Sequence, residues 1–403
     1  MNVTVSATGE PSSPPRSAVW PSRYDILDGW RGLAALLVVC DHAFGFHWGH
    51  WAVLIFFVIS GYCISVSANS CQGKGLGTLG FVRRRIRRIY PPYFFALLFY
   101  FATRAVKSLL LHTNEFPNLS LVQYVQNFTL TQWVTMIFHP STIAYRNPTL
   151  VVVGFWYLNY EEQFILLMAL ALLLGSIWQR IKIVHFVSFL GLVGVFWVAI
   201  FGKLCHGLFI DYWPVFTLGS LVYMRLAKCP GILTQRAIDI ALAVLVVILS
   251  IFTYFHPCDY NAVLLTGDGR AVFAELLLAA SFGLLLIYTR TLNDWVHRSR
   301  AGAALHFLGK ISYSLYLVNQ FNLTLVFGIT GVLLPTGSPI FVRAPVIMGL
   351  HVLVATVFWF FCERPFLNEP ILEPPIQGKQ ERKPAPVCAI SAVVDLPHKS
   401  PEK

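Results

Sequence analysis

The sequence predicts an all-α, polytopic membrane protein in which about ten transmembrane helices surround a central polar channel. Hydrophobic residues make up 56% of the 403 positions and charged residues only 12%, about half the share in an ordinary soluble domain. Apolar runs near 20 residues, long enough to cross a bilayer as helices, recur along most of the chain. A few ionisable residues lie inside these runs, where they are costly and mark functional sites. Such a chain is expected to contact the lipid bilayer and no nucleic acid.

The apolar runs lie between two polar tails. Residues 1–22 are rich in Ser and Pro, and residues 371–403 carry Pro, Lys and Glu with little periodicity; both are expected to be disordered. The membrane domain then covers 23–370. Its first apolar run begins near Ile26 without an early basic cluster, which favours a permanent span over a cleaved signal peptide. The predicted spans are 27–47, 50–69, 90–111, 150–178, 184–202, 207–226, 235–256, 271–290, 304–333 and 343–367.

Two segments do not fit a simple span. Residues 113–148 contain Pro117, Pro140 and Pro148 around a moderately apolar middle, which predicts an interfacial or re-entrant piece. The 304–333 segment is too long for one straight span, so it is expected to tilt, break or extend past the bilayer.

The distribution of basic residues orients this arrangement. With ten spans, both termini and four connections share one side of the membrane, and these segments hold 23 of the 30 Lys and Arg residues. Because basic residues concentrate in cytoplasmic loops, both termini are predicted to be cytoplasmic. We expect a multi-pass protein of the inner (plasma) membrane.

Five arginines lie within six positions ahead of the third span, in the segment FVRRRIRRIYPPY. Juxtamembrane arginines often mark only the cytoplasmic end of a helix and its anionic lipids. On a helix, however, Arg88 lies one turn after both Arg84 and Arg85, so the three share a face. Pro91 and Pro92 suit the first turn of the following helix. Forked guanidinium groups on one face suit a ligand with several phosphates.

The first span carries the most informative ionisable residues. His42 follows Asp28 by 14 residues, about 21 Å along a helix, which places it past the membrane middle towards the outer side. Arg31 and His42 are 11 residues apart, close to three turns, so they share one stripe, as residues lining a channel do. A helix-end histidine at the outer interface is the alternative. Asp41 does not face its neighbour His42 on a helix, so a carboxylate from another helix is the expected partner.

The fourth span offers such a carboxylate in GFWYLNYEEQFILL, residues 154–167. Glu161 and Glu162 lie deep in apolar sequence, so at least one must face a cavity or a partner. Glu161 is expected to orient a histidine base or to pair with Arg31, with a structural ion pair as the alternative. Trp156 fits either an interfacial aromatic belt or a substrate-binding position.

Two later stretches also carry polar residues. In LGKISYSLYLVNQ, Tyr313, Tyr316 and Gln320 share one helical face. The motif FCERPF ends the last span with Glu363 and Arg364, which favours a helix end docked by charge. The eight cysteines form no CxxC pair, which argues against a metal site.

Six of these segments occur in one order along the chain: LDGWRGLAALLVVCDHA, LIFFVISGYCIS, FVRRRIRRIYPPY, FWYLNYEEQF, ISYSLYL and CERPF. Together they resemble the acyltransferase-3 family of integral membrane O-acyltransferases over about residues 25–367. The resemblance implies a cytosolic acyl-CoA donor and an acceptor hydroxyl at the outer side. It implies a catalytic role for His42 and matches the family's first-helix arginine, arginine pair and acidic position with Arg31, Arg85, Arg88 and Glu161.

Two positions depart from the family pattern. Tyr157 stands where relatives often have Ser, and Asn319 stands where relatives often have His. If that histidine takes part in acceptor binding, this protein handles its acceptor differently.

The resulting hypothesis is an O-acyltransferase that moves an acyl group, acetyl by expectation, to a carbohydrate or glycolipid acceptor. Acyl-CoA is the donor substrate, and no permanently bound cofactor is expected. Phosphates bind the arginine cluster, the pantetheine arm passes Arg31, and His42 acts as general base or forms an acyl-histidine. Glu161 would orient His42, and Tyr313 or Tyr157 would donate to the developing oxyanion.

Two other classes of protein remain as alternatives. A transporter or flippase would use Asp41, His42 and Glu161 as a proton relay, and an inverted repeat with broken helices would be its sign. The sequence has no evident self-similarity of this kind. A passive membrane scaffold would tolerate replacement of all the buried ionisable residues.

Overall fold

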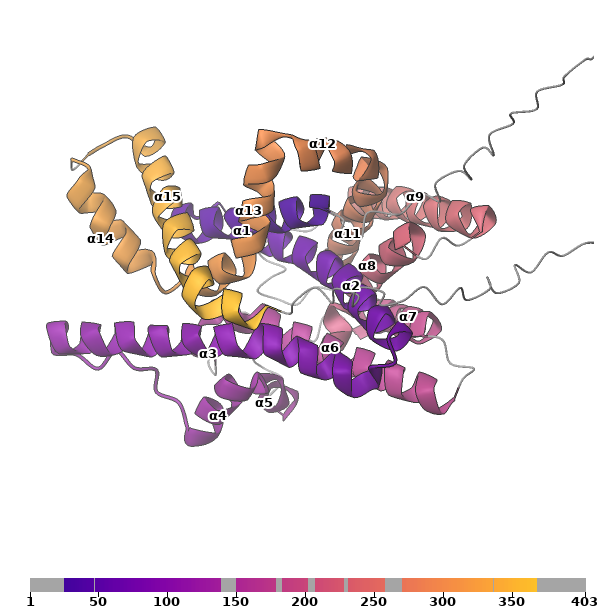
Figure 1. Ribbon diagram of the computed structural model, residues 1–403, viewed down its shortest axis with the longest axis horizontal. Coiled ribbons are helices and arrows are strands. Elements are labelled where there is room, and N and C mark those ends of the chain that lie inside the picture. Colours follow the sequence, from indigo (N-terminus) through magenta and orange to yellow (C-terminus); the bar gives the residue numbers. More distant parts are fainter. Residues whose placement is uncertain are drawn as a thin grey trace, which may run out of the picture. The chain divides into compact units, whose positions relative to one another are not determined.

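Helices form all the regular structure in the part of the chain that the computed structural model describes, which confirms the all-α prediction (Figure 1). That part comprises residues 25–46, 48–138, 150–178, 183–201, 207–227, 231–257, 270–335 and 337–367. Short 3₁₀ turns precede or follow several helices. The helices are α1 (Asp25–Phe44), α2 (Gly49–Gly73), α3 (Gly77–Leu111), α4 (Leu121–Thr129), α5 (Gln132–Phe138), α6 (Trp156–Ile177), α7 (Ile183–Phe201), α8 (Trp213–Ala227), α9 (Ile232–Phe255), α11 (Arg270–Tyr288), α12 (Asn293–Arg298), α13 (Arg300–Val318), α14 (Leu323–Leu333) and α15 (Ile340–Phe358).

The membrane-spanning capacity of these helices supports a multi-pass protein. Every predicted span overlaps a helix, but length and apolar composition single out six candidates among the described residues: α2, α3, Val153–Ile177, α9, Arg270–Leu292 and Ile340–Phe366. The pair α13 and α14 adds a seventh if it forms one broken span. Four charged residues interrupt α1, and α8 has only 15 residues. The count of ten spans and the cytoplasmic placement of both termini stay predictions.

The two expected tails lie outside the described residues, which end at Leu367. So do Cys205 and Cys258. The described helices all belong to one unit, Met1–Leu367.

The third span differs from its prediction at its beginning. It is part of one continuous helix of 35 residues, α3, which starts at Gly77 and carries Pro91 and Pro92 inside it rather than in its first turn. The two prolines remove only the helical hydrogen bonds to the carbonyls of Arg87 and Arg88. The helix continues through them, so the arginines and the apolar span lie on one helix.

Two glycine-mediated crossings hold the centre of the bundle together. A Cβ atom on Gly61 of α2 would overlap the backbone carbonyl of Phe216 in α8, and one on Gly219 would overlap the carbonyl of Val58. The same holds between α1 and α13, where a Cβ on Gly309 would overlap the carbonyl of Asp28. Small residues that let backbones approach closely are a common basis of helix association in membranes.

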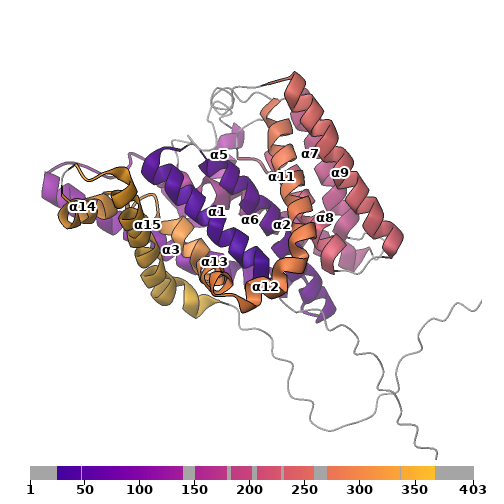
Figure 2. The same cartoon turned by 90° about the horizontal axis from the view of Figure 1, so that it is seen from above.

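The helices α1 and α13 lie next to each other (Figures 1 and 2), and their contacts keep one parallel register. Gly29 lies against Leu305, and Gly32 lies against Leu308. Near the far ends of the same helices, His42 meets Asn319. Because these pairs advance together along both helices, the close glycine contacts at one end determine which residues meet at the other.

The segment between α3 and α6 forms two short helices, α4 and α5, beside α3 (Figure 1). The hydroxyl of Tyr93 in α3 donates to the backbone carbonyl of Asn127. The Asn127 side chain is buried and accepts from Gln132 at 3.0 Å and from the amide of Val151 at 2.9 Å. Residues 139–149 lie outside the described residues, and the interfacial or re-entrant nature of the segment stays a prediction.

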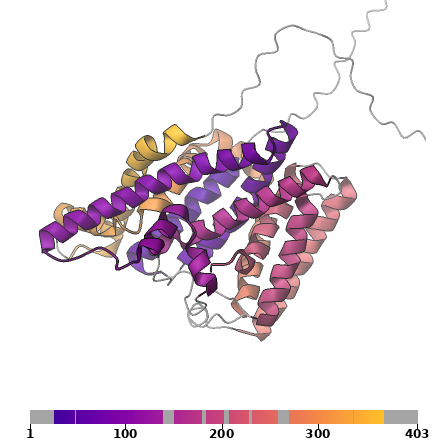
Figure 3. The same ribbon diagram turned by 90° about the horizontal axis from the view of Figure 1, so that it is seen from below.

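The long 304–333 segment breaks, which was one of its three predicted forms. α13 ends at Val318, and α14 leaves it at an angle of 104°. On the other side of the unit, α7, α8, α9 and α11 pack into a second group of helices (Figure 3). The break places Asn319 at the end of α13, against α1.

Candidate active site

His42 lies in the last turn of α1, and its ring is held by an amide from α13. Its Nδ1 atom lies 2.5 Å from Oδ1 of Asn319. The Asn319 side chain is itself fixed, because its Nδ2 donates to the carbonyl of Leu315 at 3.0 Å and to that of Tyr316 at 2.7 Å. Asn319 is buried, with 1% of its surface exposed, while His42 is only half-buried. A rigid, dry amide therefore orients a partly accessible imidazole.

Glu161 does not occupy the position expected for it beside His42. Its Oε1 accepts a hydrogen bond from Ser60 Oγ at 3.3 Å, and Ser60 Oγ lies 2.6 Å from the hydroxyl of Tyr157. Ser60 is 11 residues into α2, about 16 Å along the helix, whereas His42 is close to the loop that joins α1 to α2. The carboxylate thus lies deeper in the bundle than the imidazole, and the amide of Asn319 takes the orienting position.

The middle of the site is a set of mutually interacting polar groups. Arg31 is in electrostatic contact with Asp28, Glu363 and Tyr157. The carboxylate of Glu161 lies within electrostatic range of Arg85 of α3, and its expected pairing with Arg31 stays a prediction. Arg31 is half-buried although groups from α6 and from the end of α15 reach it.

The arginine segment presents the predicted face to the bundle. Arg85 is buried and donates from a terminal nitrogen to the backbone carbonyl of Cys63 at 2.7 Å. Arg84 and Arg88 are half-buried, whereas Arg83 and Arg87 are exposed. The shared face deduced from the spacing is confirmed.

The motif at the end of the last span joins the same region. The buried carboxylate of Glu363 accepts from the Ser314 amide at 3.1 Å and from its hydroxyl at 2.5 Å. It also lies in electrostatic contact with Arg31 and Arg88. The guanidinium group of Arg364 stacks on Trp359 and Phe360. The predicted docking of this helix end by charge is confirmed.

Hydrogen bonds and electrostatic interactions relate a set of polar side chains between α3 and the end of α1, which we call the polar column. Glu161 is in electrostatic contact with Tyr313 and with Tyr316, and the Asn319 amide is anchored on the carbonyl of Tyr316. The polar column consists of Arg85, Arg88, Arg31, Glu363, Ser60, Glu161, Tyr157, Tyr313, Tyr316, Asn319 and His42.

The tyrosines of the polar column are engaged with protein groups. The hydroxyl of Tyr313 donates to the carbonyl of Ile89 at 3.0 Å, and that of Tyr316 donates to the carbonyl of Gly154. Since Ser60 donates to Glu161, the hydroxyl of Tyr157 must donate to Ser60. In this conformation neither Tyr313 nor Tyr157 has its proton directed at an oxyanion.

Trp156 lies outside the polar column. Its ring is parallel to that of His50, with the ring centres 6.1 Å apart, and His50 Nε2 lies 2.8 Å from Glu275 Oε1. Adjacent helical residues do not share a face, so Trp156 points away when Tyr157 points inward. The sequence reasoning missed the His50–Glu275 pair, although an acidic residue in the apolar helix α11 signals a partner.

A second histidine near His42 was also missed. His351 of α15 is fully buried, within electrostatic range of His42, and neither ring nitrogen has a partner among the described residues. A contact of 3.8 Å between the sulfur atoms of Cys40 and Met348 joins α1 to α15 nearby. A histidine within an apolar span is the signal that identifies such a position.

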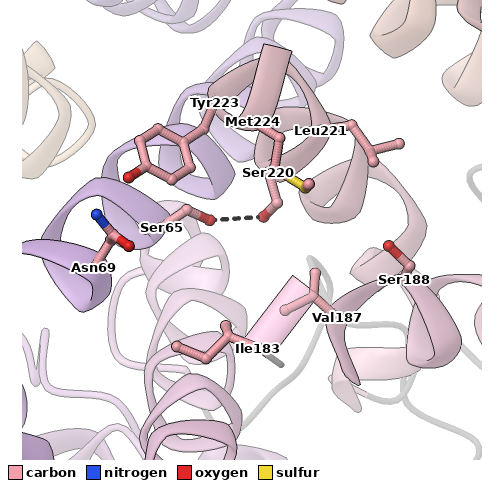
Figure 4. Close-up of a pocket in the computed structure, with 9 residues that line it drawn as sticks. All are labelled: Ser65, Asn69, Ile183, Val187, Ser188, Ser220, Leu221, Tyr223 and Met224. Carbon is pink, nitrogen blue, oxygen red and sulfur yellow. Dashed lines mark hydrogen bonds between the residues drawn. The ribbon is translucent and has the colours of Figure 1, made fainter. Parts of the chain in front are cut away.

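A separate, partly open pocket lies between α2, α7 and α8 (Figure 4). Ser65 donates to Ser220 across it at 2.9 Å, and Asn69 lies at its edge. Ser65 follows Ser60, a member of the polar column, by five residues, about 140° around the helix. The pocket therefore lies on a different face of α2 from the polar column.

Comparison with known proteins identifies the family of the chain. A family model described as an acyltransferase domain matches residues 24–362. The protein named "Protein 2 in picA locus" from Rhizobium radiobacter is 37% identical over 83 residues, or 19% of this chain and 44% of that protein. The chain thus covers less than half the length of this curated relative. No solved structure matches the chain. Because the family model covers nearly all of the helical region, the chain belongs to the acyltransferase-3 family of integral membrane O-acyltransferases.

Proposed function

We propose that the protein transfers an acyl group, acetyl in the simplest case, from cytosolic acyl-CoA to a hydroxyl group of a carbohydrate or glycolipid acceptor at the outer side of the membrane. The observation that carries this proposal is the polar column. It joins the arginines on the bundle-facing side of α3 to an oriented histidine at the far end of α1. Membership of the family supports acyl transfer, and the polar column supports transfer from a donor at the arginines to an acceptor at His42.

The donor binds at the arginine end. Arg84 and Arg88 retain accessible surface on the inward face of α3, and guanidinium groups bind phosphates through paired hydrogen bonds. The pantetheine arm then lies along the column past Arg31, which is 11 residues before His42, about 16 Å of helix. This arm lets the thioester reach His42 while the phosphates stay at the arginines.

The chemistry takes place at His42. Its ring accepts the proton of the acceptor hydroxyl while the hydroxyl oxygen forms a bond to the thioester carbonyl carbon. The carbon–sulfur bond then breaks, and the thiolate of coenzyme A takes the proton from the ring. In the route through an acyl-histidine, the ring nitrogen first bonds to the thioester carbonyl carbon and displaces the thiolate of coenzyme A. The acceptor oxygen then bonds to the same carbon, the bond to the ring nitrogen breaks, and the thiolate takes the proton of the hydroxyl group.

Glu161 acts in this scheme as the charge partner of Arg85. A buried guanidinium group is costly without a carboxylate nearby, and Glu161 provides one while Ser60 and Tyr157 hold its position. Arg31 is balanced separately by Asp28 and Glu363. The column therefore carries fixed, paired charges along the proposed path of the pantetheine arm.

Radiolabelled acetyl-CoA tests the proposal directly. Membranes that contain the protein are incubated with acetyl-CoA labelled in the acetyl group, and carbohydrate and lipid fractions are counted. We expect label on one of these fractions, and none with membranes that lack the protein. If the label stays on coenzyme A or appears only as free acetate, the result contradicts acyl transfer and favours a transporter.

Replacing Arg88 with alanine is expected to weaken binding of acyl-CoA more than turnover at saturating donor. Loss of one charge-assisted contact to a phosphate corresponds to a roughly 10- to 100-fold higher Kd. Arg83→Ala is the matched control, because Arg83 is exposed on the other face of the same helix. Equilibrium binding of acetyl-CoA to the purified variants checks this, and an equal effect of both substitutions refutes the phosphate role.

A further inference from the structure

We propose that Asn319 is a positioning residue that holds His42 as the tautomer protonated on Nδ1 and thereby leaves Nε2 as the basic nitrogen. The inference deepens the proposed acyl transfer and rests on it for the catalytic consequence. The tautomer itself follows from hydrogen bonds and is testable without any substrate.

The orientation of the Asn319 amide is determined by its surroundings. Its NH₂ group has two hydrogens, and the carbonyls of Leu315 and Tyr316 accept them at 3.0 and 2.7 Å. Exchanging the amide oxygen and nitrogen would place the oxygen against two carbonyl oxygens without a proton between them. The oxygen atom Oδ1 must therefore face His42.

An oxygen that can only accept defines the proton on the ring. His42 Nδ1 lies 2.5 Å from Oδ1 of Asn319, so a hydrogen bond exists only if Nδ1 carries the proton. A neutral imidazole has one donor and one acceptor nitrogen, and the bond at one nitrogen fixes the role of the other. Nε2 is then the atom with the lone pair that accepts a proton from a hydroxyl group.

The choice of an amide has a chemical consequence. Unlike a carboxylate or a second imidazole, an amide does not titrate, so the orienting contact stays the same over the working pH range. When Nε2 takes the proton from the hydroxyl group of the acyl acceptor, the hydrogen bond from Nδ1 to Asn319 becomes charge-assisted and therefore stronger. Asn319 thus stabilises the developing imidazolium without adding a charge of its own.

Other titratable groups near His42 are few in the described structure. His351 approaches from α15 and Asp41 lies on α1 itself, with one carboxylate oxygen buried and unpartnered among the described residues. From α13, Tyr316 lies one turn before Asn319, and from α6 the carboxylate of Glu161 lies deeper in the polar column. A change of pH response on substitution of Asn319 must be separated from these groups, which the substitutions below leave in place.

Two substitutions separate positioning from packing. Asn319→Leu keeps the approximate volume and removes the acceptor at Nδ1, and we expect kcat to fall on the order of 10- to 100-fold. Asn319→Asp introduces a carboxylate that favours the imidazolium, so the acidic limb of the pH dependence of kcat/KM should move to higher pH by about one unit or more. Asn322→Leu is the matched control, since Asn322 is buried in the same break and its side chain has no partner among the described residues.

The tautomer is read separately by NMR of the full-length protein with ¹⁵N-labelled histidine, with the His42 signals identified from their loss in His42→Gln. We expect a proton on Nδ1 and none on Nε2 in the neutral form. A proton on Nε2 overturns the proposal, as does an unchanged pH profile in Asn319→Asp. Equal losses of kcat in Asn319→Leu and Asn322→Leu show that the effect is packing and also overturn it. If no acyl transfer is detected from any acyl-CoA, the proposed function fails, while the NMR result still decides the tautomer.

Discussion

Substitution of His42 by alanine is expected to lower the rate of acyl transfer on the order of 10²- to 10⁴-fold, the range that a positioned general acid–base group contributes. The imidazole ring is the end of the polar column, and no other described residue is held there by a fixed amide acceptor. The arginines that bind the donor lie on α3, far along the column, so the Kd of acyl-CoA should stay within about twofold of that of the unaltered protein.

The measurement is transfer by the purified variant at saturating donor, together with equilibrium binding of acetyl-CoA. His185→Ala is the matched control, because His185 is exposed on α7. Near-normal transfer by His42→Ala would refute the catalytic assignment. A large loss of donor binding would show instead that the substitution disturbs the whole column.

Substitution of Gly309 by alanine is expected to give the second large effect, on both stability and activity. A Cβ at this position would overlap the backbone carbonyl of Asp28, which lies in the first turn of α1 and is held there by the packing of the helix. Overpacking of this kind costs about 1–3 kcal/mol. The shift of α1 against α13 also changes the register that brings His42 to Asn319, and a displacement of about 1 Å at a catalytic group costs on the order of 10²-fold in rate.

The effect is measured as the midpoint of thermal unfolding in detergent and as the transfer rate of the fraction that remains folded. Gly349→Ala in α15 is the matched control, because a Cβ there meets nothing within 4 Å. A Gly309→Ala protein with unaltered midpoint and rate would contradict the role of the α1–α13 contact in setting the register.

Local spacing predicted those features of the site that lie on one helix. The i, i+3 and i+4 relations placed Arg84, Arg85 and Arg88 on one face, and burial of that face agrees. Each predicted span overlaps a helix, whereas the short helices α4, α5 and α12 lie between the predicted spans. The start of α3 was misplaced because a pair of prolines was interpreted as a helix beginning, although α3 accommodates them in its interior.

Contacts between residues on different helices could be found only from the structure. The depth of Glu161 relative to His42 depends on how far α6 is displaced along α2, and spacing within one helix contains no information about that displacement. The contact from Asn319 to His42 depends on the register of α1 against α13, which Gly32 and Gly309 set by allowing backbone contact. Both glycines are visible in the sequence, but only the structure shows that they face each other's helix.

The central claim is that a donor bound at the arginines extends along the polar column to His42. An acyl-CoA with a photoreactive acyl group, added to the cytosolic face of membrane vesicles and mapped by mass spectrometry after irradiation, tests it most directly. The account predicts cross-links to the outer half of α1 around His42 and to the end of α13 around Asn319, and their loss when unlabelled acetyl-CoA is in excess. Cross-links confined to the arginine segment of α3 would show that the thioester does not reach the imidazole and would contradict the account.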